Sequence, residues 1–210
     1  MEKIDEIRAF LEREIVPLYD RHDGGHRRDH AHYVMNESQH LAQYYPEVDR
    51  SMLLVAAAYH DIGLIEGREH HHESSARMLR DDRRLDRWFT PEQIGIMADA
   101  AEDHRASNKH EPRTIYGRLI AESDRQINGD TIIRRTIQYS FANYPGMDRE
   151  EHYRRFLEHM AEKYAEGGYL KLWIPESDNA KRLQEFRRLL DDPEQLRRCF
   201  DEIFDKLQNQ

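Results

Sequence analysis

Hydrophobic residues recur at helical spacing over most of the chain. In the first segment Ile4, Ile7 and Phe10 lie three residues apart, which predicts an amphipathic helix over residues 3–19. The same reasoning predicts further helices over about 29–45, 50–60, 73–80, 91–104, 113–127, 130–144, 148–166, 177–190 and 193–207. Residues 169–174 could form a short extended segment. The pattern therefore predicts an all-α protein.

Polar residues at the predicted helix starts support these boundaries. Asp49, Asp130 and Asp148 occupy positions expected of N-caps, and Thr90 precedes a proline and an acidic residue. Gly63 follows the central helix, where we expect it to end that helix in a left-handed conformation.

The most apolar stretch, residues 52–59, contains three consecutive alanines and shows no alternation of period two. It therefore predicts a buried helix. This helix ends at His60 and Asp61, and a buried carboxylate is costly unless it is paired or bound to a metal. From this pair alone, a surface helix end that His60 and Asp61 merely cap is an equal alternative.

Length and charge narrow the class of protein. The 210 residues suit one domain, residues 1–145, with a C-terminal helical extension, residues 146–210, packed on it as one structural unit. The net charge of -9 argues against binding to a nucleic-acid polymer. The single cysteine, Cys199, excludes an intramolecular disulfide. Without an apolar signal core or a long apolar window, we expect a cytoplasmic protein with no membrane contact.

Imidazole and carboxylate groups in several predicted helices could form a metal site, as they do in other helical bundles. Such ligands suit iron, manganese, nickel, cobalt or zinc, so we expect one or two divalent transition metal ions. The candidate ligands are His30, His60, Asp61, His71, His104 and Asp124.

The order of these residues resembles the H…HD…D signature of the HD superfamily of metal-dependent phosphohydrolases. The signature residues here are His30, His60, Asp61 and Asp124, and the run Glu-Ser-Asp-Arg at 122–125 resembles the distal segment of that family. The resemblance spans about residues 28–126. It implies an all-α bundle and a phosphohydrolase activity.

A second resemblance concerns HD members that bind two metals. The run His-His-Glu-Ser-Ser-Ala at 71–76 resembles their additional ligand segment, and alignment on Ser75 selects His71 rather than His72. The implied ligand sets share Asp61: His30, His60, Asp61 and Asp124 for one ion, and Asp61, His71 and His104 for the other.

Other histidines compete for these roles. His32 lies two residues from His30, but the spacing to Val34 favours His30. Asp103 either orients His104 or is a surface acid. His70 and His72 are expected to face the substrate or to be solvated, whereas His110, His152 and His159 are expected at the surface. His22 and His26 lie in a loop before the first ligand helix, where a histidine is usually solvated.

The chain departs from many HD proteins at Leu64, where they have a lysine near the substrate phosphate. A phosphate contact is therefore expected from Arg68, Arg105 or Arg125, with Arg105 first because a guanidinium can bind phosphate through two hydrogen bonds. The alternative for Arg105 is a cation that stabilises a helix C-terminus.

These features predict hydrolysis of a small phosphorylated molecule, nucleotides first, by attack of metal-bound hydroxide on phosphorus. Asp61 would be ligand and proton acceptor, and Arg105 the phosphate contact. The alternative is a non-catalytic metal- or nucleotide-binding regulatory module, which the loss of lysine at Leu64 favours. A metal-dependent oxygenase on a related scaffold is a third alternative, and a homodimer stays open.

Overall fold

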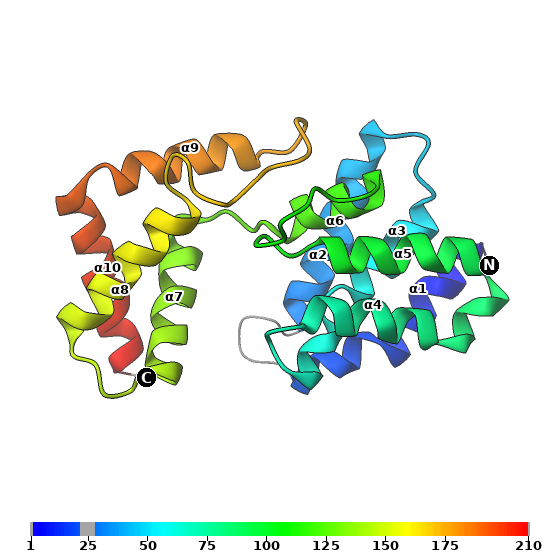
Figure 1. Ribbon diagram of the computed structural model, residues 1–210, viewed down its shortest axis with the longest axis horizontal. Helices are drawn as coiled ribbons and strands as arrows, with labels where there is room; N and C mark the ends of the chain where they lie inside the picture. Colours follow the sequence, from blue (N-terminus) through cyan, green and yellow to red (C-terminus); the bar gives the residue numbers. More distant parts are fainter. Residues whose placement is uncertain (1, 22–27, 210) are drawn as a thin grey trace. The chain divides into compact units, whose positions relative to one another are not determined.

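The computed structural model describes residues 2–21 and 28–209, so His22 and His26 lie outside the described residues. Over the described residues the chain forms helices and no strand, which confirms the all-α prediction (Figure 1). The α-helices are α1 Lys3–Glu14, α2 Arg28–Leu41, α3 Arg50–Tyr59, α4 His71–Asp81, α5 Pro91–Asp103, α6 Ile115–Asp124, α7 Gly129–Asn143, α8 Arg149–Lys163, α9 Asn179–Leu190 and α10 Pro193–Gln208.

The helices form two compact units. The first contains Met1–Arg125 and Leu172–Ser177, and the second contains Gln126–Lys171 and Asp178–Gln210. This division differs from the predicted boundary between residues 145 and 146, because α7 packs against α8 and α10 and belongs to the second unit. Hydrophobic periodicity predicted that residues 130–144 form a helix, but it could not predict which other helices this helix packs against.

Helix α3 is the centre of the first unit. Every residue from Ser51 to Tyr59 is buried, and α3 contacts α1, α2, α5 and α6. The Asp49 carboxylate caps the helix by accepting hydrogen bonds from the backbone N–H groups of Ser51 and Met52. The prediction of a buried, Asp49-capped helix is confirmed, and α3 delivers His60 to the interior.

The chain turns sharply after Asp61, and Gly63 permits the turn for a different reason than expected. The prediction of a left-handed Gly63 is wrong, since the glycines with positive φ among the described residues are Gly67 and Gly167. Gly63 instead lies within a 3-10 turn, Ile62–Glu66, where a Cβ atom would collide with the backbone of His71 and Ser75. The Gly63 N–H also donates to the Ser75 hydroxyl at 2.9 Å. This close approach holds the turn against the N-terminus of α4.

Most predicted helix caps are confirmed. Thr90 and Asp148 both form capping boxes at the starts of α5 and α8. The prediction for Asp130 is wrong: Asn128 caps α7 by accepting the Thr131 N–H at 3.0 Å, and Asp130 lies in the first turn. Residues 169–174 form no strand.

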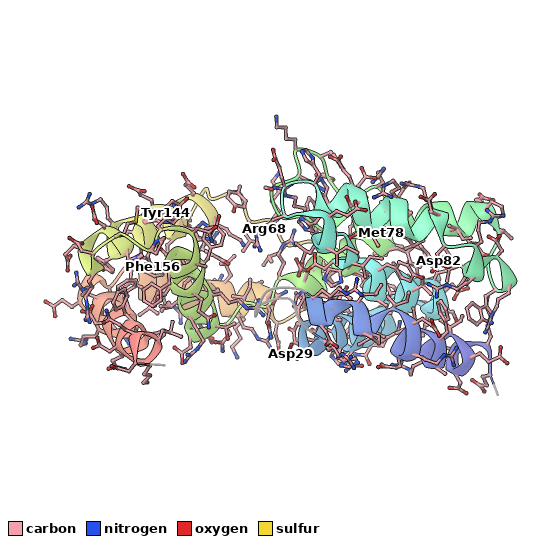
Figure 2. All side chains as sticks on the ribbon, turned by 90° about the horizontal axis from the view of Figure 1, so that it is seen from below. Asp29, Arg68, Met78, Asp82, Tyr144 and Phe156 are labelled. Carbon is pink, nitrogen blue, oxygen red and sulfur yellow. The ribbon has the colours of Figure 1, made fainter. Side chains whose placement is uncertain are left out.

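The second unit is held together by aromatic rings between α8 and α10. The ring centroids of Phe156 and Phe200 are 5.2 Å apart, and Phe156 points into the interior of the unit (Figure 2). His152, predicted at the surface, is buried beside Ser140, with 2.7 Å between the Ser140 hydroxyl and His152 Nδ1. Its position on α8 faces α7, a tertiary contact that the sequence pattern did not reveal.

Within the part of the chain that the structure describes, no helix combines the length and the apolarity needed to cross a membrane.

Candidate metal centre

A buried tyrosine shapes the turn that carries His60 and Asp61. The Tyr19 hydroxyl donates to the Ala58 carbonyl at 3.0 Å and accepts the Asp61 N–H at 3.3 Å. His60 and Asp61 are 0% and 3% exposed. Tyr19 therefore fixes the backbone on either side of His60, and it lies in a segment that the sequence pattern identified only as amphipathic helix.

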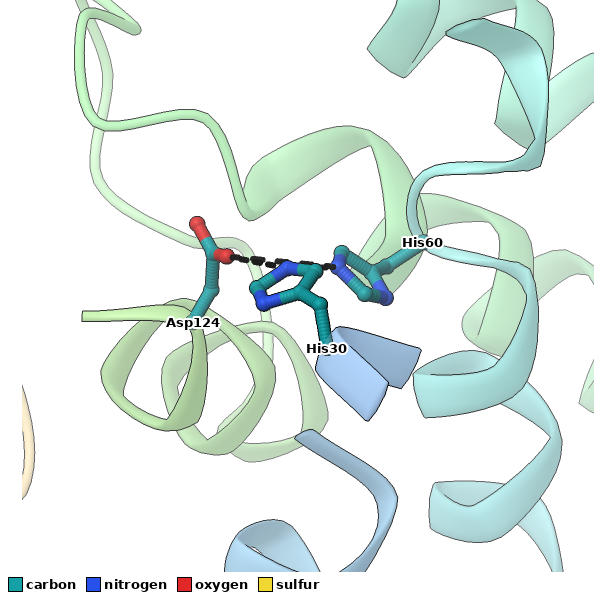
Figure 3. Close-up of side chains that lie close together, drawn as sticks. All are labelled: His30, His60 and Asp124. Carbon is teal, nitrogen blue, oxygen red and sulfur yellow. Dashed lines mark hydrogen bonds and ion pairs between the residues drawn. The ribbon is translucent and has the colours of Figure 1, made fainter. Parts of the chain in front are cut away.

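His30, His60 and Asp124 form the first of two groups of side chains (Figure 3). His30 Nε2 lies 3.2 Å from His60 Nε2 and 3.2 Å from Asp124 Oδ1. The distance from His60 Nε2 to the same carboxylate oxygen is 3.9 Å. Helices α2 and α6 and the end of α3 thus bring together residues that lie far apart in the sequence.

Asp61, His71 and His104 form the second group. His71 Nε2 lies 3.2 Å from His104 Nε2. His71 begins α4 and His104 follows the last residue of α5, two helices that run side by side (Figure 1). The predicted choice of His71 over His72 agrees with this placement, since His72 is in neither group.

Asp61 stands between the two groups. Its Oδ2 atom lies 3.6 Å from His30 Nε2 and 3.4 Å from His60 Nε2. Its Oδ1 atom lies 3.4 Å from His71 Nε2 and 3.3 Å from His104 Nε2. Each oxygen of one carboxylate therefore faces a different group.

Backbone carbonyls fix the orientation of the imidazoles. In His60, His71 and His104 the Nδ1 atom lies within hydrogen-bond distance of the carbonyl three residues earlier. The distances are 2.7 Å to Ala57, 2.8 Å to Arg68 and 2.5 Å to Ala101, respectively. A carbonyl can only accept, so Nδ1 carries the hydrogen and Nε2 of the neutral ring keeps its lone pair.

This arrangement fits divalent metals. Lone pairs on neighbouring Nε2 atoms face one another and face carboxylate oxygens, which is unfavourable unless cations lie among them. Imidazole nitrogen together with carboxylate oxygen suits transition metals rather than calcium or magnesium. The first group with Asp61 would hold one ion, and the second group would hold another.

Comparison with known proteins agrees with the geometry. Residues 27–129 match the family model of the HD domain. The chain contains an HD domain. The match supports divalent metal binding and the metal-dependent phosphohydrolase class in general.

The chain is also similar to the crystal structure of a predicted HD superfamily hydrolase from an uncultured Thermotogales bacterium. The two chains are 19% identical, the TM-score is 0.49, and the likeness covers 74% of this chain and 86% of the other. The comparison with curated proteins found no match.

Two histidines of the site, His60 and His71, have pKa values shifted in opposite directions. Burial lowers the pKa of His60, but Asp61 and Asp124 outweigh this effect and raise it to about 9. Burial and the neighbouring His104 lower the pKa of His71 to about 4. Without a metal, His60 is therefore protonated at neutral pH and His71 is not.

The carboxyl groups of Asp61 and Asp124 are held ionised. Burial would raise the pKa of Asp61, but His60 and His104 hold it well below its usual value. Asp124 behaves similarly because His30 outweighs the effect of burial. Negative charge is thus retained at the centre of the site.

Other predicted candidates lie around the two groups. His32 is partly exposed and pairs with Glu12 at 2.9 Å, whereas His30 is buried and is therefore the inward residue of α2. Arg105 is partly exposed; its Nη1 atom donates to the Glu69 carbonyl and lies 3.4 Å from Nδ1 of the buried His72. Arg68 is exposed.

Asp103 is neither a surface acid nor the partner of the His104 ring. It is 2% exposed and accepts a hydrogen bond from Arg113 Nε at 3.0 Å, while the His104 ring is held by Ala101. Its partner, Arg113, lies in the loop before α6, and no local sequence signal joined the two residues.

Glu122 is an additional buried acid that the sequence pattern did not single out as structural. Its carboxylate accepts the N–H groups of Trp173 at 2.6 Å and Ile174 at 3.3 Å, and the Ser177 hydroxyl. These bonds attach residues 172–177 to α6, the helix that carries Asp124. Ile174 lies in the core of the first unit and Trp173 packs against that core. Residues 172–177 therefore belong to the same unit as the proposed ligands.

Proposed function

We propose that the protein is a metal-dependent phosphohydrolase that acts on a small phosphorylated molecule, with nucleotides as the first candidates. The observation that carries the proposal is the position of Asp61, whose two oxygens face separate groups of imidazole and carboxylate donors. Divalent metals bound to such donors would activate water and offset negative charge on phosphoryl oxygens.

The side chains contribute binding and orientation. The low pKa of Asp61 keeps it ionised, which supports it as a ligand shared by both groups. A carboxylate of low pKa is a weak base, so proton acceptor is only its second proposed role. Arg105 follows His104 directly and is partly exposed, which supports it as the contact for a substrate phosphate. Hydrogen bonding to the Glu69 carbonyl would hold its guanidinium in place.

A non-catalytic metal- or nucleotide-binding module is the second candidate. Leu64 favours it, because an apolar side chain at this half-buried position cannot supply the positive charge of the lysine that many HD proteins have there.

The first experiment is phosphate release from a panel of nucleoside mono-, di- and triphosphates and simple phosphomonoesters. The chelated protein would be reloaded with manganese, cobalt, nickel, iron or zinc, and metal content would be measured by mass spectrometry. We expect about two metals and turnover in the wild type. In His71→Ala we expect about one metal and a rate lower by about 100-fold.

His70→Ala is the matched control, because His70 is exposed and adjacent to His71. It should keep the metals and the rate within about twofold. Metal binding without turnover of any phosphate compound would favour the binding module. Turnover that survives in Asp61→Asn would contradict the proposed site.

A further inference from the structure

Arg125 is buried directly beside the proposed ligands. It follows Asp124 at the end of α6 and is 6% exposed. A buried guanidinium is costly unless its surroundings satisfy it. Here it also adds positive charge to a site expected to bind cations, so its presence needs a compensating role.

The contacts of Arg125 reach both donor groups. Its Nη1 atom donates to the backbone carbonyl of His104 at 2.8 Å and lies 3.6 Å from Asp124 Oδ2. The other oxygen of Asp124, Oδ1, faces His30 in the first group. The guanidinium therefore engages the carboxylate oxygen that the imidazoles do not use.

The contact with His104 acts on the second group through the backbone. The His104 ring is tied by Nδ1 to the Ala101 carbonyl in the last turn of α5, so its direction follows the backbone at that point. Fixing the His104 carbonyl thus fixes the position of its Nε2 atom. An arginine suits this role because its planar group offers donors in fixed directions.

We propose that Arg125 is a positioning residue that couples the two donor groups, holding Asp124 for the first and His104 for the second. This inference rests on the proposed function to the extent that both require the same metal ligands. It does not require hydrolysis of a phosphate compound. It predicts that loss of Arg125 weakens both metal sites together, whereas loss of His71 removes one site and leaves the other.

The test is a titration of the metal-free full-length chain with manganese, in which electron paramagnetic resonance measures the bound and free ion. The signal of free Mn²⁺ gives the number and affinity of the sites, and a coupled signal reports two adjacent ions. In Arg125→Met we expect both affinities to fall by about 10- to 100-fold. Arg125→Lys, which keeps the charge and a donor, should recover at least half of this loss on a logarithmic scale.

Arg118→Met is the matched control, because Arg118 lies on the same helix and is exposed. It should bind manganese as the wild type does. Circular dichroism and urea unfolding of each metal-free variant would separate a change in affinity from a change in folding. If Arg125→Met does not fold, Arg125→Gln, which is neutral and keeps an N–H donor, replaces it with the same expected direction.

Unchanged or tighter manganese binding in the neutral variant would overturn the inference, as would a loss confined to one site. A wild type that binds no manganese would overturn both this inference and the proposed function. A wild type that binds two ions but hydrolyses no phosphate compound would overturn the proposed function alone, and the Arg125 comparison would still stand.

Discussion

At the scale of single residues, the geometry of the site depends on the close approach of Gly63 to the backbone of α4. Gly63 places the turn after Asp61 against the backbone of α4, which begins with His71. The separation between the two groups of donors is therefore set partly by the absence of one methyl group.

Gly63→Ala should lower the free energy of unfolding by at least about 2 kcal/mol, because the added Cβ forces α4 away. It should also weaken the second metal site more than the first. Urea unfolding and manganese titration would measure the two effects. Gly95→Ala is the control: Gly95 lies inside α5 with open space beside it, so this change should stabilise by about 0.5–1 kcal/mol. Equal effects of the two substitutions would contradict the close-approach argument.

The raised pKa of His60 links metal binding to pH. Binding requires its neutral ring, but without metal the pKa is about 9, so below that value a proton must leave. Apparent manganese affinity should therefore rise about tenfold per pH unit between pH 6 and 8 for this one proton. His71, with a pKa of about 4, is already neutral and adds nothing over this range. Calorimetry in buffers of different ionisation enthalpy would count the released protons, and a count of zero would contradict the argument.

At the scale of elements, the end of α6 is braced by a segment distant in sequence. Glu122 lies two residues before Asp124. Its carboxylate accepts hydrogen bonds from the backbone N–H groups of Trp173 and Ile174 and from the Ser177 hydroxyl. Because the carboxylate is fully buried, these bonds replace the water it lost on folding.

Glu122→Gln should destabilise the protein by about 2–3 kcal/mol, since a neutral amide of the same shape forms weaker bonds and presents its own donors. Hydrogen exchange of the Trp173 and Ile174 amides should accelerate. Glu111→Gln, at an exposed position before α6, should change neither quantity. Unaltered protection of the two amides in Glu122→Gln would show that the carboxylate does not anchor the segment.

The sequence predicted those parts that local pattern encodes. Helix periodicity placed α3, and residue type, order and spacing selected His30 over His32 and His71 over His72. Their role as ligands stays a prediction. The sequence did not predict contacts whose partners lie on other elements, such as Tyr19 with the His60-Asp61 turn. The surface position expected for His152 was wrong, and so were both roles expected for Asp103, a partner of His104 or a surface acid. The reason is the same in each case: only the fold supplies Ser140 and Arg113 as partners.

At the scale of the whole molecule, each unit can be followed by its own probe. Both tryptophans, Trp88 and Trp173, lie in the first unit, and the single cysteine, Cys199, lies in the second. Manganese at about 100 times its dissociation constant should stabilise the first unit by about 2.7 kcal/mol.

Tryptophan fluorescence should therefore show a higher unfolding temperature with manganese. The temperature at which a thiol reagent begins to label the partly exposed Cys199 faster than in the folded protein should not change. Calcium, which these donors do not suit, is the control. If manganese protects Cys199 as strongly as it stabilises the tryptophan signal, the two units unfold together.

Because the chain passes from the first unit to the second and back, recombination between genes should not exchange one unit without the other. The first unit takes in Leu172–Ser177 after the chain has already entered the second unit. A gene fragment that ends at Arg125 would encode the proposed ligands but lack the residues that satisfy Glu122. Recombination at that point would move an incomplete HD-containing unit, so we expect the two units to be passed on together rather than exchanged as separate modules.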